Sequence, residues 1–215
     1  MIWSEGVIAR AISLQTLARK CVVLVDNCNW TGHECDVLGV TTDLRIIDVE
    51  VKISRSDLKA DAKKDKWWHR VFAGYAPESR EYFPDGRWKA TYRESLWDST
   101  PMMHPSKVWK HYYAMPADIW KPELLDFLPS PASGVILMRE QRNSGTPVVA
   151  EVVRRATPSK DAYRLQPSQV LDIARLANLR MWEAYSREES ANKQVSDMRN
   201  EHIQALAALQ VQEAA

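Results

Sequence analysis

The chain has 215 residues, of which 45% are hydrophobic and 27% are charged. This length and composition predict one domain with a sizeable core and an appendage, and they exclude two full domains. The formal net charge of +1 excludes a uniformly basic surface, so any contact with nucleic acid must come from local patches.

The N-terminal segment and the cysteines bear on the compartment. The chain has no long uncharged apolar run, and charges at Glu5 and Arg10 argue against a signal peptide. The three cysteines (Cys21, Cys28 and Cys35) form no Cys-x-x-Cys pair and no Cys/His grouping with the close spacing of a zinc site. We therefore expect buried thiols in a soluble cytoplasmic protein that does not bind membranes.

The first predicted element is a helix that begins after Ser4, a favourable N-cap, and runs to about Arg19. Glu5 lies on the same helical stripe as Ile8 and Ile12, so we expect it to face the body of the protein. A first-turn carboxylate also interacts favourably with the helix dipole, which by itself requires no metal.

Three strands are predicted next. Residues 21–25 form a nearly continuous apolar run, typical of a strand covered on both faces. Residues 33–40 and 46–52 also have strand character, and the polar segment 41–43 between them favours a hairpin turn.

The third of these strands separates apolar from charged residues. Because side chains alternate between the faces of a strand, Asp48, Glu50 and Lys52 share the face opposite to Val49 and Val51. Such a row of charges is also common on a solvated face, where it forms at most weak ion pairs.

The predicted hairpin brings Asp36 beside Glu50. Two carboxylates, with water and a substrate phosphate, are the usual ligands of Mg²⁺, and Lys52 would lie beside the ion. Glu34 and Asp48 fall on the same faces as Asp36 and Glu50, and we expect them to be neighbours of the site.

These residues resemble a known family. Asp36, thirteen intervening residues and Glu50-Val51-Lys52, followed by residues 54–61, are similar to the PD-(D/E)XK nuclease superfamily, in particular its small bacterial and phage members. The resemblance covers about residues 4–140. It implies an α/β fold with an αβββαβ core and a mixed central sheet. It also implies a Mg²⁺ or Mn²⁺ site held by Asp36 and Glu50, with Glu5 as a further ligand, and a Lys52 that orients or activates water.

Residues 57–71 are predicted to form a helix with a basic outer surface. Lys59 and Lys63 belong to this surface, together with Lys64 and Lys66. The helix could meet a phosphate backbone, although acidic residues are mixed in and an ordinary solvated face is the alternative.

Residues 72–107 are predicted to be an insertion. The turn at 84–87 favours a hairpin of strands 80–83 and 88–92. Aromatic residues alternate here with basic ones, including Arg87 and Lys89, a composition suited to single-stranded nucleic acid. A small satellite core or a dimer contact is the alternative.

The sheet is predicted to resume with strands 110–116, 134–138 and 148–154, and with a short helix at 119–128. His111 falls in the first of these strands, where a core or edge position is favoured over a role near the metal. Residues 1–155 thus form the predicted core.

Residues 156–215 are predicted to be a helical extension. One helix begins at Pro167, and a second stretch has apolar residues at coiled-coil spacing. This stripe needs a surface to cover it, so we expect a homo-oligomer formed through these helices or the insertion. The residues of the second stripe are Val195, Met198, His202, Ala205 and Leu209.

The functional hypothesis is a metal-dependent nuclease that hydrolyses DNA, with endonuclease action favoured, in repair, recombination or phage DNA processing. The alternative is a catalytically silent scaffold that binds nucleic acid or a protein partner. A small-molecule enzyme has little support, because P-loop, GxGxxG and GxSxG motifs are all absent from the sequence.

Overall fold

A mixed six-stranded sheet forms the centre of the protein. The computed structural model describes residues 3–76, 80–90, 93–141 and 147–213. The strand order is β1-β2-β3-β8-β9-β10; the β3–β8 and β8–β9 pairs are parallel and the others antiparallel. The fold is therefore mixed α/β, as expected from the sequence. The strands are β1 (Cys21–Cys28), β2 (Cys35–Thr41), β3 (Ile46–Val51), β8 (Val108–Pro116), β9 (Gly134–Glu140) and β10 (Val148–Arg154).

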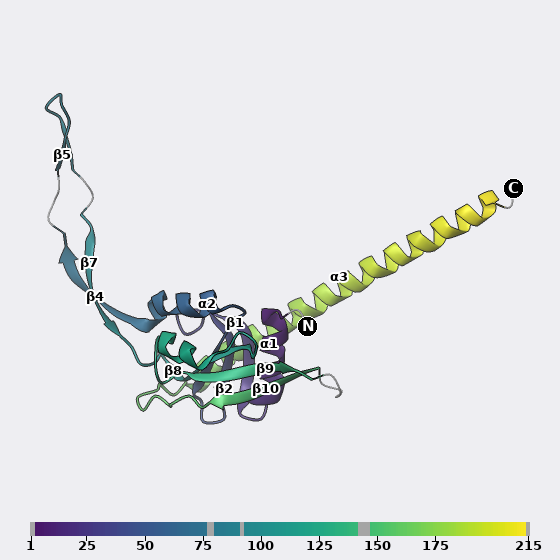
Figure 1. Ribbon diagram of the computed structural model, residues 1–215, viewed down its shortest axis with the longest axis horizontal. Helices are drawn as coiled ribbons and strands as arrows, with labels where there is room; N and C mark the ends of the chain where they lie inside the picture. Colours follow the sequence, from purple (N-terminus) through teal and green to yellow (C-terminus); the bar gives the residue numbers. More distant parts are fainter. Residues whose placement is uncertain (1–2, 77–79, 91–92, 142–146, 214–215) are drawn as a thin grey trace.

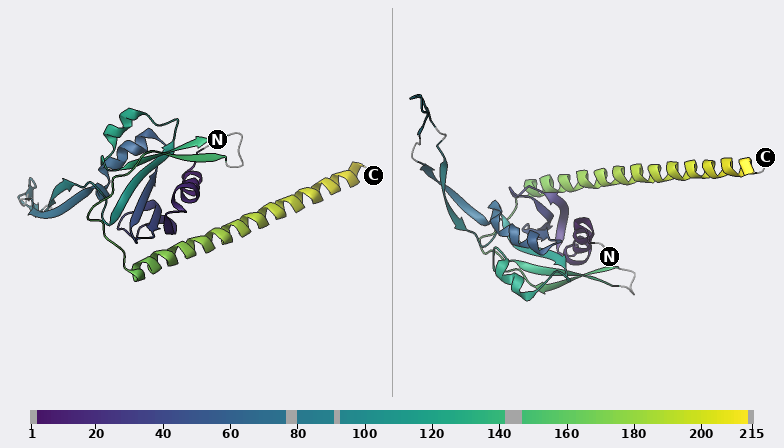
Figure 2. Two further views of the ribbon diagram at one scale, coloured as in Figure 1. Left: turned by 90° about the horizontal axis from the view of Figure 1, so that it is seen from below. Right: turned by 45° about the horizontal axis from the view of Figure 1, so that its top comes forward.

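Helix α1 (Glu5–Ile12) covers one face of this sheet, as Figure 2 shows. The Ser4 hydroxyl accepts a hydrogen bond from the Val7 N–H at 3.3 Å, which confirms the predicted N-cap. Ile8 and Ile12 are fully buried against Val49 and neighbouring strand residues. A π-helical turn, η1 (Ser13–Leu17), ends the element.

The opposite face of the sheet carries the charged residues of β3, and it is covered rather than solvated. Short helical segments pack on it around Leu58, Trp67 and Tyr113, and the first turns of the C-terminal helix pack through Ile173. All six residues of β3 are buried. The alternation predicted for this strand is confirmed, but its charges require internal partners.

The segment after β3 differs from its prediction. The helix expected at 57–71 is limited to α2 (Arg55–Ala60), and two 3₁₀ turns follow, η2 (Asp61–Lys63) and η3 (Asp65–Trp67). Strand β4 (Trp68–Tyr75) then begins, where aromatic and β-branched residues disfavour a helix. The Trp67 indole N–H donates to the Asp61 carboxylate at 3.1 Å, and this buried bond stabilises the turns in place of a longer helix.

The predicted insertion is a long two-stranded ribbon that stands away from the sheet (Figure 1). β4 pairs antiparallel with β7 (Ser95–Pro101), and β5 (Arg80–Tyr82) pairs with β6 (Trp88–Ala90) near the tip. The expected hairpin at 84–87 is confirmed: Gly86 has a φ of 82°, which favours glycine. Residues 91 and 92, assigned to the second strand of this hairpin, lie outside the described residues.

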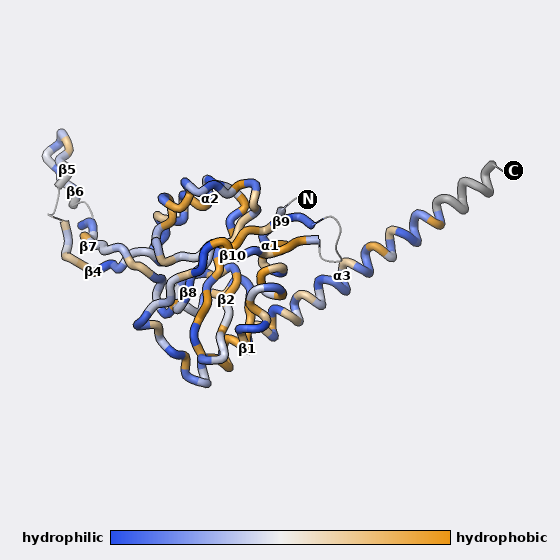
Figure 3. Tube along the Cα trace, turned by 60° about the horizontal axis from the view of Figure 1, so that its bottom comes forward, coloured by the Kyte–Doolittle hydropathy of each residue, from blue (hydrophilic) through white to orange (hydrophobic). Residues whose placement is uncertain are grey.

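The C-terminal extension is one continuous helix, α3 (Pro167–Glu213), rather than the two helices expected. Its first turns pack on β1, and the described side chains from Met181 onward are exposed. Figure 3 shows hydrophobic residues concentrated in the sheet, whereas polar and apolar residues are mixed along α3. The side chains of Ala205 and Leu209 lie outside the described residues. A short 3₁₀ helix, η4 (Pro122–Phe127), replaces the helix expected at 119–128.

In the described part of the chain, no helix combines the length and the apolar character needed to cross a membrane.

Candidate active site

The pairing of β2 with β3 brings Asp36 to the position expected for it. Val37 lies opposite Val49, and the Asp36 carboxylate accepts a hydrogen bond from the Val51 N–H at 2.6 Å. Asp36 is half-buried and lies close enough to Glu50 for the two charges to interact. The hairpin therefore places two carboxylates together, as the sequence indicated.

The environment of Asp36 disfavours its negative charge. Burial, followed by the neighbouring charge of Glu50, raises the pKa of Asp36 to about 6. Glu5 contributes a smaller effect in the same direction, although its side chain is exposed at the start of α1 rather than turned into the protein. Among the described residues, the groups of three or more side chains whose ligand atoms lie within 4.8 Å of one another do not include Asp36 or Glu5, so the three carboxylates expected to hold a metal are not gathered at one point.

Glu50 is buried among three ammonium groups. Its Oε2 accepts hydrogen bonds from Lys52 Nζ and from Lys64 Nζ, each at 3.2 Å, and its Oε1 accepts one from Lys66. Lys52 and Lys66 are buried, whereas the Lys64 side chain is half-exposed. The expectation of an outer surface is wrong for Lys66, which is buried because Glu50 requires positive partners, whereas Lys64 is exposed as expected and still reaches Glu50.

Asp61 is a second carboxylate of this cluster that the sequence did not single out. Its Oδ1 lies 3.0 Å from Lys52 Nζ and 2.9 Å from Lys64 Nζ, and its Oδ2 accepts a hydrogen bond from the Tyr113 hydroxyl at 2.5 Å. Burial disfavours ionisation of Asp61, but the lysines outweigh it, and the pKa of Asp61 lies well below its usual value. Asp57 Oδ1 also lies 3.7 Å from Lys52 Nζ, so three lysines face three carboxylates and their charges balance.

The four basic residues expected to contact nucleic acid are exposed but are not brought to Glu50. Lys59 lies over the Phe127 ring at 4.1 Å, and Lys63 belongs to the exposed side of η2. Arg87 and Lys89 lie on the distant end of the ribbon (Figure 1), where Arg87 pairs with Asp85 at 2.6 Å.

Beside Glu50 lies a second polar group, centred on Asp48. Its Oδ2 is 3.2 Å from His33 Nε2 and 3.8 Å from His111 Nε2. Asp48, Glu50 and His111 each offer one ligand atom, and these three atoms lie within 4.8 Å of one another. His33, Cys35 and Asp48 form a second group with the same property. The strand alternation had placed Asp48 on the Glu50 face, but the contacts with His33 and His111 join segments distant in sequence.

Comparisons with known proteins give little information on function. No family model matches the sequence, and no curated protein is significantly similar to it. One solved structure, the SPO1766 protein of unknown function from Silicibacter pomeroyi, is 18% identical and aligns with a TM-score of 0.48. The alignment covers 87% of this chain and 92% of that chain. A similarity at this level carries no argument about activity.

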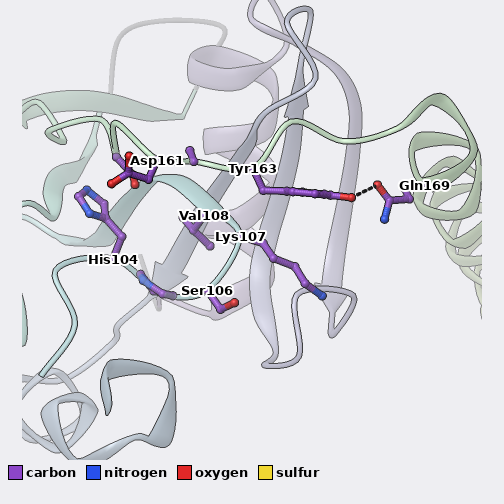
Figure 4. Close-up of a pocket in the computed structure, with 10 residues that line it drawn as sticks. His104, Ser106, Lys107, Val108, Asp161, Tyr163 and Gln169 are labelled. Atoms are coloured by element: carbon purple, nitrogen blue, oxygen red, sulfur yellow. Dashed lines mark hydrogen bonds between the residues drawn. The ribbon is translucent and has the colours of Figure 1, made fainter. Parts of the chain in front are cut away.

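A separate hollow of about 450 Å³ lies between the segment before β8 and the start of α3 (Figure 4). His104, Lys107 and Asp161 are among its lining residues, and the Tyr163 hydroxyl donates to Gln169 Oε1 at 2.9 Å. It shares no residue with the carboxylate and lysine cluster.

Proposed function

We propose that this protein is a Mg²⁺- or Mn²⁺-dependent nuclease that hydrolyses phosphodiester bonds of DNA, with endonuclease action favoured. The observation that carries the proposal is the position of Asp36 beside Glu50, where burial and like charge raise the pKa of Asp36 to about 6. Two neighbouring carboxylates, of which Asp36 has no ammonium partner in hydrogen-bond contact among the described residues, favour a bound cation. Repair, recombination and phage DNA processing are the settings that fit this activity.

The donor set at this position suits a hard cation. Asp36 and Glu50 offer carboxylate oxygens, and Glu5 offers a third from the exposed first turn of α1. When bound, Mg²⁺ or Mn²⁺ supplies a water of lowered pKa and stabilises negative charge on the phosphate oxygens. Glu50 would exchange one or more of its ammonium contacts for this ligand role.

The lysines have a defined part in this proposal. Lys52 Nζ lies between Glu50 and Asp61, at 3.2 and 3.0 Å, so its position is fixed by two carboxylates. From there it orients the attacking water or holds a phosphate oxygen. Lys64 is half-exposed, so its ammonium group could leave Glu50 and Asp61 to contact a substrate phosphate.

DNA would be held by exposed basic residues that lie away from Glu50. Lys59 and Lys63 belong to α2 and η2, and Arg87 and Lys89 accompany exposed aromatics such as Trp88 on the distant end of the ribbon. Phosphate contacts of this kind release counterions, so replacing Lys59 and Lys63 by alanine should reduce the salt slope of DNA binding by about 2. Lys193→Ala, on the exposed part of α3, is the control.

The activity is tested with closed circular single-stranded DNA, supercoiled duplex and RNA, each with Mg²⁺, Mn²⁺ or EDTA. Cleavage of a closed circle would identify an endonuclease and its polymer. Lys52→Ala and Asp36→Ala should abolish metal-dependent cleavage, whereas Glu34→Gln removes an exposed carboxylate near Asp36 and should not. Wild-type rates in Lys52→Ala or Asp36→Ala would refute the assigned roles.

A catalytically silent scaffold is the second candidate. The observation that favours it is the set of ammonium groups around Glu50, which satisfies this carboxylate without a metal. Calorimetric titration with Mn²⁺ separates the two candidates. A nuclease should lose a binding event in Asp36→Asn, whereas a scaffold should show identical titrations for wild type and variant.

We also propose that the protein self-associates, through α3 or through the ribbon. Both elements expose large apolar side chains beyond the body of the protein, among them Trp97, Trp182 and Met198. Exposed apolar residues of this size are typical of association surfaces. Light scattering of the full chain, compared with a chain lacking residues 188–215, tests the part played by α3.

A further inference from the structure

The group around Asp48 has the composition of a transition-metal site. We infer that His33, Cys35, Asp48 and His111 bind a borderline divalent cation of the Zn²⁺ class, at a position separate from the Asp36 carboxylate. This inference does not depend on nuclease activity, because none of these four residues has a role in the proposed hydrolysis.

The ligand atoms come from three elements. His33 precedes β2, Cys35 begins it, Asp48 lies in the middle of β3 and His111 lies on β8. His33, Cys35 and Asp48 each offer one ligand atom within 4.8 Å of the others, which is close to the separation that a shared ion requires. His111 Nε2 lies 3.8 Å from Asp48 Oδ2 and belongs, with Asp48 and Glu50, to the other group of ligand atoms within 4.8 Å of one another, so we assign it as the fourth ligand.

Two of these atoms have unsatisfied hydrogen-bonding capacity. Asp48 Oδ1 and His111 Nε2 are buried and make no hydrogen bond within the described residues, and both side chains are at most 1% exposed. Buried polar atoms of this kind are rare and call for a physical explanation. A cation between Asp48 and His111 satisfies both.

The two histidines are held as metal ligands usually are. His111 Nδ1 lies 3.1 Å from Ser133 Oγ, and His33 Nδ1 lies 3.3 Å from Thr31 Oγ1, so in each ring the Nε2 atom is directed to Asp48. Such outer hydrogen bonds fix the orientation of ligating imidazoles.

The chemistry of the donors selects the ion. One thiolate, two imidazoles and one carboxylate suit tetrahedral Zn²⁺ and not Mg²⁺, which prefers oxygen ligands and octahedral geometry. Binding would release the proton of the Cys35 thiol to solvent, since the thiolate is the ligand form. With four protein ligands the site is structural, and it would fasten the loop before β2 to β3 and β8.

Cobalt(II) is the probe for this site, because a Co²⁺–thiolate bond gives a near-ultraviolet charge-transfer band that a carboxylate site cannot give. The full chain is titrated with Co²⁺, and Zn²⁺ is then added as competitor. The variants are Cys35→Ser and His33→Asn, and Cys28→Ser is the matched control because it removes another buried thiol outside the group. Asp36→Asn is included to separate this site from the proposed catalytic one.

We expect one Co²⁺ per chain, with a band that Zn²⁺ displaces and that persists in Cys28→Ser and Asp36→Asn. Cys35→Ser should lose the band, and His33→Asn should weaken Zn²⁺ binding at least tenfold. Absence of the band in wild type, its survival in Cys35→Ser or its loss in Cys28→Ser would overturn the inference. Circular dichroism reports folding, and if Cys35→Ser does not fold, an unchanged Zn²⁺ affinity of His33→Asn would itself overturn it.

Discussion

Replacing Asp36 by asparagine should stabilise the protein in the absence of divalent metal. The asparagine side chain would keep an oxygen that can accept the Val51 N–H bond, while the substitution removes a half-buried negative charge beside Glu50. The pKa of Asp36 is raised from 3.8 to about 6, and each unit is equivalent to about 1.4 kcal/mol. The upper limit of the gain is therefore about 3 kcal/mol, and partial solvent screening reduces our expectation to about 1–2 kcal/mol.

The increase in unfolding free energy that Asp36→Asn gives should depend on pH. The folded carboxyl keeps its proton up to about pH 6, whereas the unfolded one releases it near pH 3.8, so the folded state binds more protons between these values. Wild-type stability should thus fall relative to Asp36→Asn as the pH rises from about 4 to about 6. Above pH 6 the difference should be constant, and below about pH 4 it should disappear.

Urea unfolding of both chains at pH 4, 6 and 8 in EDTA measures this difference, provided that both remain folded at pH 4. The exposed carboxylate of Glu34 gives a matched control, since Glu34→Gln should change stability by no more than about 0.5 kcal/mol. Addition of Mn²⁺ should stabilise wild type more than the variant. An Asp36→Asn chain that is less stable than wild type at pH 8 in EDTA would refute the electrostatic reasoning.

Three further predictions concern the core and the extension. Tyr113→Phe removes the buried hydroxyl that donates to Asp61 and should lower the free energy of unfolding in urea by about 1–3 kcal/mol. Tyr112→Phe, at a half-buried position, is the control and should lower it less. Equal losses would contradict the role of this hydrogen bond. Gly134→Ala would place a Cβ against the Tyr112 ring and 2.7 Å from the Ala156 backbone N, so the free energy of unfolding should fall by about 1–3 kcal/mol. An unchanged urea midpoint would show that the strand adjusts freely. Removal of residues 188–215 should change the Tm of a monomeric sample by less than about 2 °C, because the described side chains from 188 to 204 are exposed. A larger fall in Tm would reveal contacts of α3 that support the fold.

The strands of the central sheet could be predicted because their signals are local, but β4 and β7 of the ribbon were not predicted, and β1, expected to be covered on both faces, is an edge strand with Val22 exposed. The alternation around Glu50 gave the correct faces of β3, and the polar turn after β2 gave the pairing that places Asp36 near Glu50. The alternation did not show that both faces would be buried. That depends on α2 and its following turns, which fold over the charged face of β3.

Residues brought in by long-range contacts were the ones missed. Asp61 and Lys66 lie in a segment with helical character, and only the bond from Trp67 to Asp61 and the attraction of Glu50 explain why 3₁₀ turns form there. The β2–β3 hairpin brings His33 to Asp48, and His111, far away in sequence, joins them only when β3 pairs with β8. The close spacing of His33 and Cys35 is the local signal of this group, but a second closely spaced pair of ligands, as in common zinc motifs, is absent from the sequence.

The length of α3 affects how the size of the protein can be measured. A helix of 47 residues rises about 70 Å at 1.5 Å per residue. A compact body of roughly 150 residues has a radius of gyration of only about 15 Å. Because the helix and the ribbon both project from that body (Figure 1), even a monomer would elute early in gel filtration, as a more massive globular protein would. The number of subunits should therefore be determined from scattered-light mass or sedimentation equilibrium, which do not depend on shape.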